Sequence, residues 1–157
     1  MRLVDVLKKE YILPDLKARD KKELLSEMVT YLAQKVPALD REKTLQALFE
    51  RERLGTTGIG HGVALPHGKM KGIDEIRVFF ARSKEGVDFN SIDNSPVHLF
   101  FLIIAPENSA AAHLKLLACI SRILKNQNFR SQLMDASNPS VIFKLIAEAD
   151  TKNTTKS

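Results

Sequence analysis

An apolar segment in the second half of the chain constrains the fold more than any other feature. Residues Val97 to Ala105 are apolar except for His98, and most of them are β-branched or aromatic. A strand with one face in water alternates apolar and polar residues, whereas this segment is apolar at nearly every position. We therefore predict a strand over residues 97–104 in the middle of a sheet that is covered on both faces.

The same segment is too short to cross a bilayer, because a membrane-spanning helix needs about 20 predominantly apolar residues. No longer apolar run occurs elsewhere in the chain. The first ten residues, MRLVDVLKKE, lack the apolar core and the small-residue cleavage site of a secretory leader. The sequence thus predicts a cytoplasmic protein without a membrane span.

Two amphipathic helices are predicted in the first third of the chain. The first has apolar residues at helical spacing after Asp20, a favourable N-cap, and ends before Pro37. The second is predicted to begin at Asp40 and to end near Arg53. A short extended segment over residues 11–13 precedes both helices, because a proline follows it.

The rest of the chain alternates strands and helices. Strands are predicted over 63–65 and 76–81, and helices over 113–124 and 129–134 and from Pro139 onward. This alternation predicts a single α/β domain.

The last residues of the chain, DTKNTTKS, contain no apolar side chain. A segment of this kind has nothing to bury against a core and frays at a terminus. We therefore assign residues 1–148 to the domain and residues 149–157 to a flexible C-terminal tail.

The charge pattern and the cysteine content exclude several classes of protein. The 24 basic and 19 acidic residues leave a net charge of +5, but both signs are intermixed along the chain. Without a basic stripe, a helix-turn-helix or an aromatic RNA-binding motif, we predict no nucleic-acid partner. The single cysteine, Cys119, excludes an internal disulfide and a Cys-rich metal site, and its apolar helical surroundings predict a buried structural thiol.

A glycine-rich segment, GTTGIGHGVALPHGK, resembles neither of two nucleotide-binding loops. A dinucleotide fingerprint follows a strand, whereas the glycines from Gly58 to Gly62 precede one. A Walker loop has four residues between its glycines, whereas Gly62 and Gly68 enclose five, and Met70 follows Lys69 where a serine or threonine is required. We therefore predict no nucleotide cofactor, and no other cofactor is indicated.

His67 stands between two residues that restrict and release the backbone. Pro66 fixes its own φ and holds Leu65 extended, while Gly68 lets the chain turn away from the imidazole. We interpret His67 as lying at the end of a strand. A neutral imidazole is a good nucleophile near pH 7. These residues alone leave a functional and a structural role for His67 equally open.

Several ordered motifs now indicate a family. The segment from Arg51 to Lys69, the segment from Phe89 to Ile104, and the sequence HLKLL at His113 resemble the enzyme IIA component of the bacterial phosphotransferase system. The resemblance is to the mannitol/fructose class, a type-2 IIA domain, and within it to the nitrogen-regulatory branch. It covers residues 1–148 and implies a three-layer α/β/α sandwich around a mixed β-sheet.

The resemblance also implies an activity and three site residues. His67 would accept a phosphoryl group, Arg51 would lie near the phosphate, and His113, at the start of a helix, would neighbour the acceptor. Arg51 is alternatively a solvated helix residue, and Arg53 would then bind the phosphate if the helix register is different. His113 is alternatively a helix cap. The donor would be an HPr-like phosphocarrier protein.

Three functional alternatives follow from these roles. A regulatory protein would signal to a target protein through its phosphorylation state, which an isolated domain favours. A sugar-uptake component would donate the phosphate to a separate IIB protein. A non-catalytic regulatory binding module of the same fold would never take the phosphate covalently. The target and the oligomeric state are not indicated.

The remaining histidines do not indicate a metal site. No two histidines in the sequence have the i, i+4 spacing of a helical zinc site. His98 lies on the predicted central strand and is interpreted as a packed or paired histidine. His61 lies in the glycine-rich loop, where it is interpreted as modulating the site without reacting.

Overall fold

One mixed sheet with a buried central strand organises the molecule. The computed structural model describes the backbone of residues 2–155 and the side chains of residues 2–152. The central strand is β6 (Val97–Pro106), which is buried along its whole length except at half-buried His98. Its position confirms the prediction from the apolar segment.

Five further strands flank β6. Strand β5 (Arg77–Val87) pairs with it antiparallel, and β1 (Leu7–Leu13) pairs parallel with β5. On the other side, β3 (Val63–Ala64) and β4 (His67–Met70) both pair parallel with β6, and β2 (Gly58–Gly60) pairs antiparallel with β3. The strand order is β1-β5-β6-β3-β2. Strand β4, which follows β3 in the sequence, also pairs with β6.

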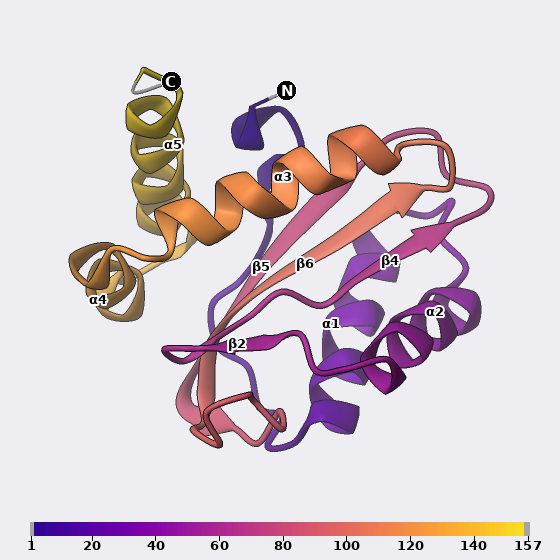
Figure 1. Ribbon diagram of the computed structural model, residues 1–157, viewed down its shortest axis with the longest axis horizontal. Coiled ribbons are helices and arrows are strands. Elements are labelled where there is room, and N and C mark those ends of the chain that lie inside the picture. The colour runs from indigo at the N-terminus through magenta and orange to yellow at the C-terminus, as the bar shows by residue number, and fades with distance from the viewer. Residues whose placement is uncertain (1, 156–157) are drawn as a thin grey trace.

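Helices cover both faces of this sheet, as Figure 1 shows. On one face lie α1 (Lys21–Lys35) and α2 (Arg41–Arg53). The other face carries α3 (Ala110–Ile123), α4 (Gln127–Asp135) and α5 (Pro139–Thr155), while a short 3₁₀ turn, η1 (Leu3–Asp5), precedes β1. The predicted three-layer α/β/α sandwich around a mixed sheet is therefore confirmed.

The first two helices begin where the sequence predicted. The Asp20 side chain accepts a hydrogen bond from the backbone N–H of Glu23 at 2.8 Å, and Asp40 accepts one from Lys43 at 3.0 Å. Each carboxylate satisfies an N–H group that has no partner inside the helix. Because the start of α2 is capped in this way and the helix runs to Arg53, Arg51 lies in its last turn.

The predicted strand end at His67 is wrong. Strand β3 stops at Ala64, and His67 is instead the first residue of β4, paired opposite Ile103 of β6. The sequence of β4, HGKM, has neither the β-branched content nor the apolar alternation of a strand. Its conformation comes from non-local hydrogen bonds to β6, which a local pattern does not record.

The predicted boundary of the C-terminal tail also differs from the structure. Helix α5 continues through Thr155, Ala149 packs against the core, and Asp150 is buried. The Asp150 carboxylate accepts a hydrogen bond from the backbone N–H of Val4 at 3.4 Å. This tertiary contact keeps polar residues helical that a local reading assigned to a tail, while residues 156–157 lie outside the described residues.

Two further features bear on the expectations from the sequence. Cys119 is half-buried rather than buried, with its Sγ 3.7 Å from the Asp150 carboxylate. None of the helices described is both long enough and apolar enough to cross a bilayer.

Candidate functional site

A cavity of about 480 Å³ is lined by residues of α2, β4 and α3, the elements labelled so in Figure 1. Pairing of β4 with β6 on one side leaves its other side facing the two helices. All three elements contribute to the walls. The lining residues are Ala47, Glu50, Arg51 and Leu54 from α2 and its C-terminus, His67, Gly68 and Lys69 from β4, and Ala110, His113, Leu114 and Leu117 from α3.

The imidazole of His67 is held in one tautomer. Its Nδ1 lies 2.8 Å from the carbonyl oxygen of Leu65, which can only accept a hydrogen bond. Nδ1 therefore carries the proton, and in the neutral ring the lone pair is on Nε2. The Nε–H of Arg51 donates to this Nε2 at 3.2 Å. The ring thus presents its nucleophilic nitrogen to a permanent cation.

Arg51 is itself held by the loop that follows α2. Its Nη1 donates to the carbonyl oxygen of Gly55 at 2.9 Å. Arg53, two residues further along the helix, is exposed and does not line the cavity. Two residues separated by two positions lie on different faces of a helix. The structure therefore brings Arg51, and not Arg53, to His67.

His113 completes the group of residues that the sequence singled out. Its ring stands edge-on to that of His67, with the centroids 5.1 Å apart and the planes at 82°. The residue is only 4% exposed, and among the described residues its buried Nε2 has no hydrogen-bond partner. A buried polar atom without a partner is costly, so it marks a position where a ligand atom would be stabilised.

The predicted position of His113 at a helix start is wrong. Ser109 is the N-cap and α3 begins at Ala110, which makes His113 the fourth residue of the helix. Its backbone N–H donates to the carbonyl oxygen of Ser109 at 2.9 Å. His113 therefore faces the cavity with its side chain, while the free N–H groups of the helix start belong to the three preceding alanines.

The surroundings favour the neutral form of both imidazoles. Burial lowers the pKa of His67; the positive charges of Arg51 and Lys69 lower it further, while the Leu65 carbonyl and Glu52 oppose them. Burial, followed by the nearby His67 and Lys69, lowers the pKa of His113 to about 4. Near pH 7, Nε2 of His67 therefore keeps its lone pair and can act as a nucleophile.

Three lining residues were missed or misread from the sequence. Lys69 lies two residues beyond His67 on β4, so both side chains project from the same face of the strand. Recognising β4 would have revealed this pairing. Leu114 is 70% exposed on a helix whose apolar residues would be expected to pack against the sheet, and Leu54 is 85% exposed. These two leucines form an apolar rim at the mouth of the cavity.

The other two histidines lie elsewhere. His98 is half-buried and donates from Nδ1 to the carbonyl oxygen of Ser83 at 2.8 Å, in agreement with the prediction of a paired histidine. His61 is exposed and lines a separate cavity of about 330 Å³ together with His98. Within residues 2–152, no three His, Cys, Asp or Glu side chains are grouped as metal ligands would be.

Comparison with known proteins identifies relatives along nearly the whole chain. The family model for the phosphoenolpyruvate-dependent sugar phosphotransferase system, EIIA 2, matches residues 5–149. A nitrogen regulatory protein of Bradyrhizobium diazoefficiens is 40% identical over 147 residues, which are 94% of this chain and 95% of that protein. The fructose-specific EIIABC component of Bacillus subtilis is 35% identical over 150 residues, 96% of this chain but 24% of that protein.

A solved structure agrees with these sequence relatives. The crystal structure of the nitrogen regulatory protein IIA-Ntr from Neisseria meningitidis matches with a TM-score of 0.85 and 32% sequence identity. The match covers 90% of this chain and 97% of that one. The chain belongs to the EIIA 2 family of the phosphoenolpyruvate-dependent sugar phosphotransferase system.

Proposed function

We propose that Nε2 of His67 accepts a phosphoryl group from a phosphohistidine carrier protein. The main support for this proposal is that the two ring nitrogens of His67 have different partners: Nδ1 donates a hydrogen bond and Nε2 accepts one. Nδ1 donates to the Leu65 carbonyl, and Nε2 faces the Arg51 guanidinium at 3.2 Å within a cavity. A neutral, oriented imidazole beside a permanent cation suits attack on a phosphorus atom whose oxygens carry negative charge.

The transfer exchanges one phosphorus–nitrogen bond for another. The Nε2 lone pair attacks the phosphorus in line, the bond to the donor imidazole breaks, and its electron pair returns to the donor nitrogen. The hydrogen bond from Nδ1 to Leu65 stabilises the positive charge that develops in the attacking ring. Arg51 gives up its contact with Nε2 and binds the oxygens of the incoming group with its planar fork of donors.

His113 and Lys69 would serve the phosphorylated state. The Nε2 of His113 is buried beside the acceptor ring without a partner among the described residues, and in its Nε2–H tautomer it can donate to a phosphate oxygen. Lys69 adds positive charge from the same strand face. Both interactions are absent before transfer and present after it, so they shift the equilibrium towards phospho-His67.

An HPr-like phosphocarrier is the proposed donor, because the mouth of the cavity suits contact with a protein. Leu54 from the end of α2 and Leu114 from α3 both line the cavity and expose their apolar side chains. Exposed apolar groups around a recessed reactive atom are typical of a docking surface. Since such a cascade begins with phosphoenolpyruvate, we place the protein in the cytoplasm.

A regulatory role is favoured over sugar uptake. The nitrogen regulatory relative is 40% identical to this chain, and the solved structure that matches with a TM-score of 0.85 is also a nitrogen regulatory protein, whereas the fructose-specific relative is 35% identical. In the regulatory role, the phosphorylation state of His67 alters binding to a target protein. In the alternative role, phospho-His67 donates to a separate IIB protein.

One experiment distinguishes these roles from a non-catalytic binding module. The protein is incubated with the general phosphotransferase enzyme, its carrier and phosphoenolpyruvate, and its intact mass is measured. We expect one phosphate that is lost in acid and retained in base, as for a phosphoramidate. No incorporation would favour the binding module, and loss of the phosphate on addition of a fructose-type or mannitol-type IIB protein would favour sugar uptake.

A further inference from the structure

A largely buried ion pair lies beside the candidate site; its carboxylate, Glu52, acts to raise the pKa of His67, but neither member of the pair lines the cavity. Glu52 follows Arg51 on α2, but it does not line the cavity and is only 8% exposed. Its carboxylate pairs with the Nζ of Lys21, from the first turn of α1, at 2.9 Å. The same carboxylate accepts the backbone N–H of Thr57 at 3.1 Å and the Thr57 hydroxyl.

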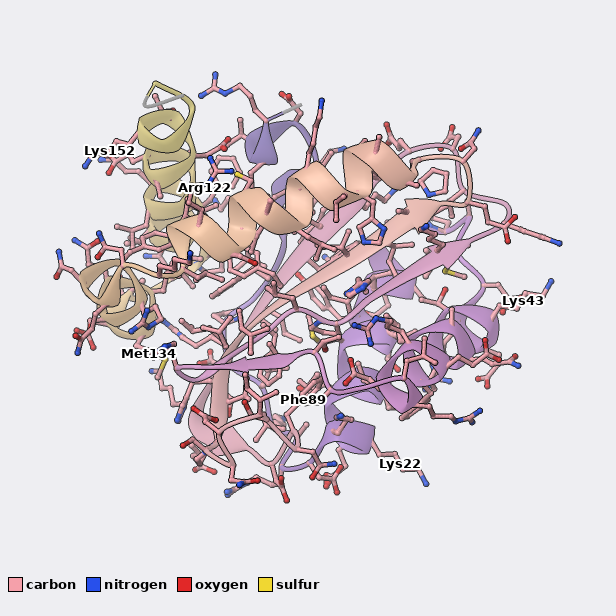
Figure 2. All side chains as sticks on the ribbon, viewed as in Figure 1. Lys22, Lys43, Phe89, Arg122, Met134 and Lys152 are labelled. Atoms are coloured by element: carbon pink, nitrogen blue, oxygen red, sulfur yellow. The ribbon has the colours of Figure 1, made fainter. Side chains whose placement is uncertain are left out.

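Lys21 extends this contact to a second part of the loop. Its Nζ donates to the Thr56 hydroxyl at 3.4 Å and lies 4.6 Å from the centre of the Phe89 ring. The Thr56 hydroxyl in turn donates to the Phe89 carbonyl oxygen at 3.2 Å. In Figure 2, Phe89 lies between β2 and the first turn of α1, the turn that carries Lys22. We name Lys21, Glu52, Thr56 and Thr57 the loop clamp.

The loop clamp sets the position of Gly55, which holds Arg51. The backbone N–H of Gly55 donates to the Glu52 carbonyl at 3.1 Å, and its φ of +149° is one that residues with a Cβ rarely adopt. Its carbonyl oxygen accepts Nη1 of Arg51 at 2.9 Å. Glu52 before Gly55 and Thr57 after it are bonded to each other, so the direction of the Gly55 carbonyl depends on the loop clamp.

A purely stabilising role is a weak explanation for such a pair. Removing two charges from water costs free energy that their attraction recovers only in part, and apolar replacements of buried ion pairs are often as stable. Hydrogen bonds accepted by a carboxylate do, however, fix the direction of the groups that donate them. The geometry of the loop clamp therefore suits orientation better than stability.

We propose that Glu52, paired with Lys21, is a positioning residue for phosphoryl transfer. It holds residues 55–57 so that the Gly55 carbonyl aims the Arg51 guanidinium at Nε2 of His67. This inference rests on the proposed function, since the orientation of Arg51 matters only if a phosphoryl group passes through the cavity. Glu52 acts through Arg51 and touches neither the acceptor nor the phosphate.

The test is a double-mutant cycle on the rate of phosphorylation by the HPr-like carrier. Glu52→Gln keeps the shape of the side chain and removes its charge. We expect its maximal rate to fall about 10- to 100-fold, the scale of a misplaced catalytic group. The carrier concentration at half-maximal rate should stay unchanged, because the apolar rim is untouched. Glu42→Gln, an exposed glutamate on the same helix, serves as the control and should match wild type.

The second half of the cycle separates positioning from general damage. In an Arg51→Ala background, Glu52→Gln should cause no further slowing, because the group it positions is already absent. An equal slowing in both backgrounds, or a wild-type rate for Glu52→Gln alone, would overturn the proposal. If circular dichroism shows that Glu52→Gln is unfolded, Thr57→Val breaks the clamp from the loop side and enters the same cycle.

A readout without activity distinguishes this inference from the proposed function. The Arg51 Nε–H resonance, assigned from its loss in Arg51→Ala, reports the contact with His67 in ¹⁵N NMR spectra. It should shift or broaden in Glu52→Gln and remain in Glu42→Gln. A wild-type protein that takes no phosphate contradicts the proposed function alone, while an unchanged Arg51 resonance in Glu52→Gln contradicts the positioning role.

Discussion

His67 and His98 are anchored alike and differ in what faces the opposite ring nitrogen. Each donates from Nδ1 to a backbone carbonyl at 2.8 Å, His67 to Leu65 and His98 to Ser83. Each is half-buried and lies on a strand of the same sheet. Beyond Nε2, however, His67 meets the Arg51 guanidinium and the ring of His113. His98 instead lines a smaller cavity shared with exposed His61.

The comparison shows that a fixed tautomer alone does not make a phosphoryl acceptor. In the neutral form of either ring, anchoring of Nδ1 as a donor places the lone pair on Nε2. Stabilisation of a transferring phosphoryl group also requires a cation and a donor that gain contacts during the transfer. Among the described residues, Arg51 and His113 supply these at His67. The four predictions that follow test this difference, beginning with the largest expected effect.

Removal of each anchored imidazole should have opposite outcomes. We expect His67→Ala to remain folded and to take up no phosphate, because it lacks the nucleophile. His98→Ala should still gain one phosphate, since its ring lies in a different cavity. Intact mass after incubation with the phosphotransferase cascade measures both. Normal labelling of His67→Ala, or no labelling of folded His98→Ala, would contradict the assignment of His67 as the acceptor.

Removal of the cation should convert the His67 environment into one closer to that of His98. Arg51→Ala should slow phosphorylation by about two to three orders of magnitude, the scale expected for loss of an electrostatic stabiliser. Arg53→Ala should change the rate little, because Arg53 is exposed and outside the cavity. Single-turnover rates at saturating carrier test this ranking. The reverse order would show that Arg53, and not Arg51, binds the phosphate.

Burial of His113 should make the folded protein sensitive to acid. The folded pKa of about 4 lies below the value of 6.5 expected when unfolded, so the unfolded chain binds the proton first as pH falls. Stability is therefore lost between pH 6.5 and pH 4, by about 3 kcal/mol in total. Urea unfolding at pH 7, 5 and 4 should show a weaker acid dependence for His113→Gln. Parallel pH dependences of the two proteins would contradict this.

The orphaned nitrogen of His113 should matter more after transfer than before it. We expect His113→Ala either to shorten the lifetime of phospho-His67 about tenfold or to slow its onward transfer about tenfold. This is the effect of losing one hydrogen bond to a charged group. Acceptance should slow less, because the bond forms only when the phosphate is present. Single-turnover phosphorylation and dephosphorylation at pH 6 and pH 8 compare the two steps. Equal slowing in both directions at both pH values would make His113 an orienting residue only.

Much of the architecture was predictable from local patterns. The apolar segment at 97–104 predicted the buried central strand, and the carboxylates of Asp20 and Asp40 marked the starts of α1 and α2. These features are written in consecutive residues, because helix capping and apolar burial act over a few positions. Arg51, His67 and His113 were singled out through motifs of the family, and the structure brings all three to one cavity.

Two of the errors share one physical cause. Strand β4 and the length of α5 depend on partners distant in the sequence, β6 for β4 and the N-terminal segment for Asp150. The start of α3 is different, because its N-cap, Ser109, is the neighbouring residue. Polar segments such as HGKM carry no local signal for a strand. Their conformation is decided by hydrogen bonds that form only when the chain has folded.

The sequence by itself determined the buried central strand, the starts of the first two helices and the residue types needed for phosphoryl transfer. Tertiary structure alone decided which nitrogen of His67 is free, which arginine faces it and which carboxylate sits behind that arginine. The reason is the separation of the residues along the chain. Periodicity and capping act within a few residues, whereas His67 and Arg51 are 16 residues apart and His113 lies on another helix. A hydrogen bond requires a specific distance and angle, and only the folded chain defines them.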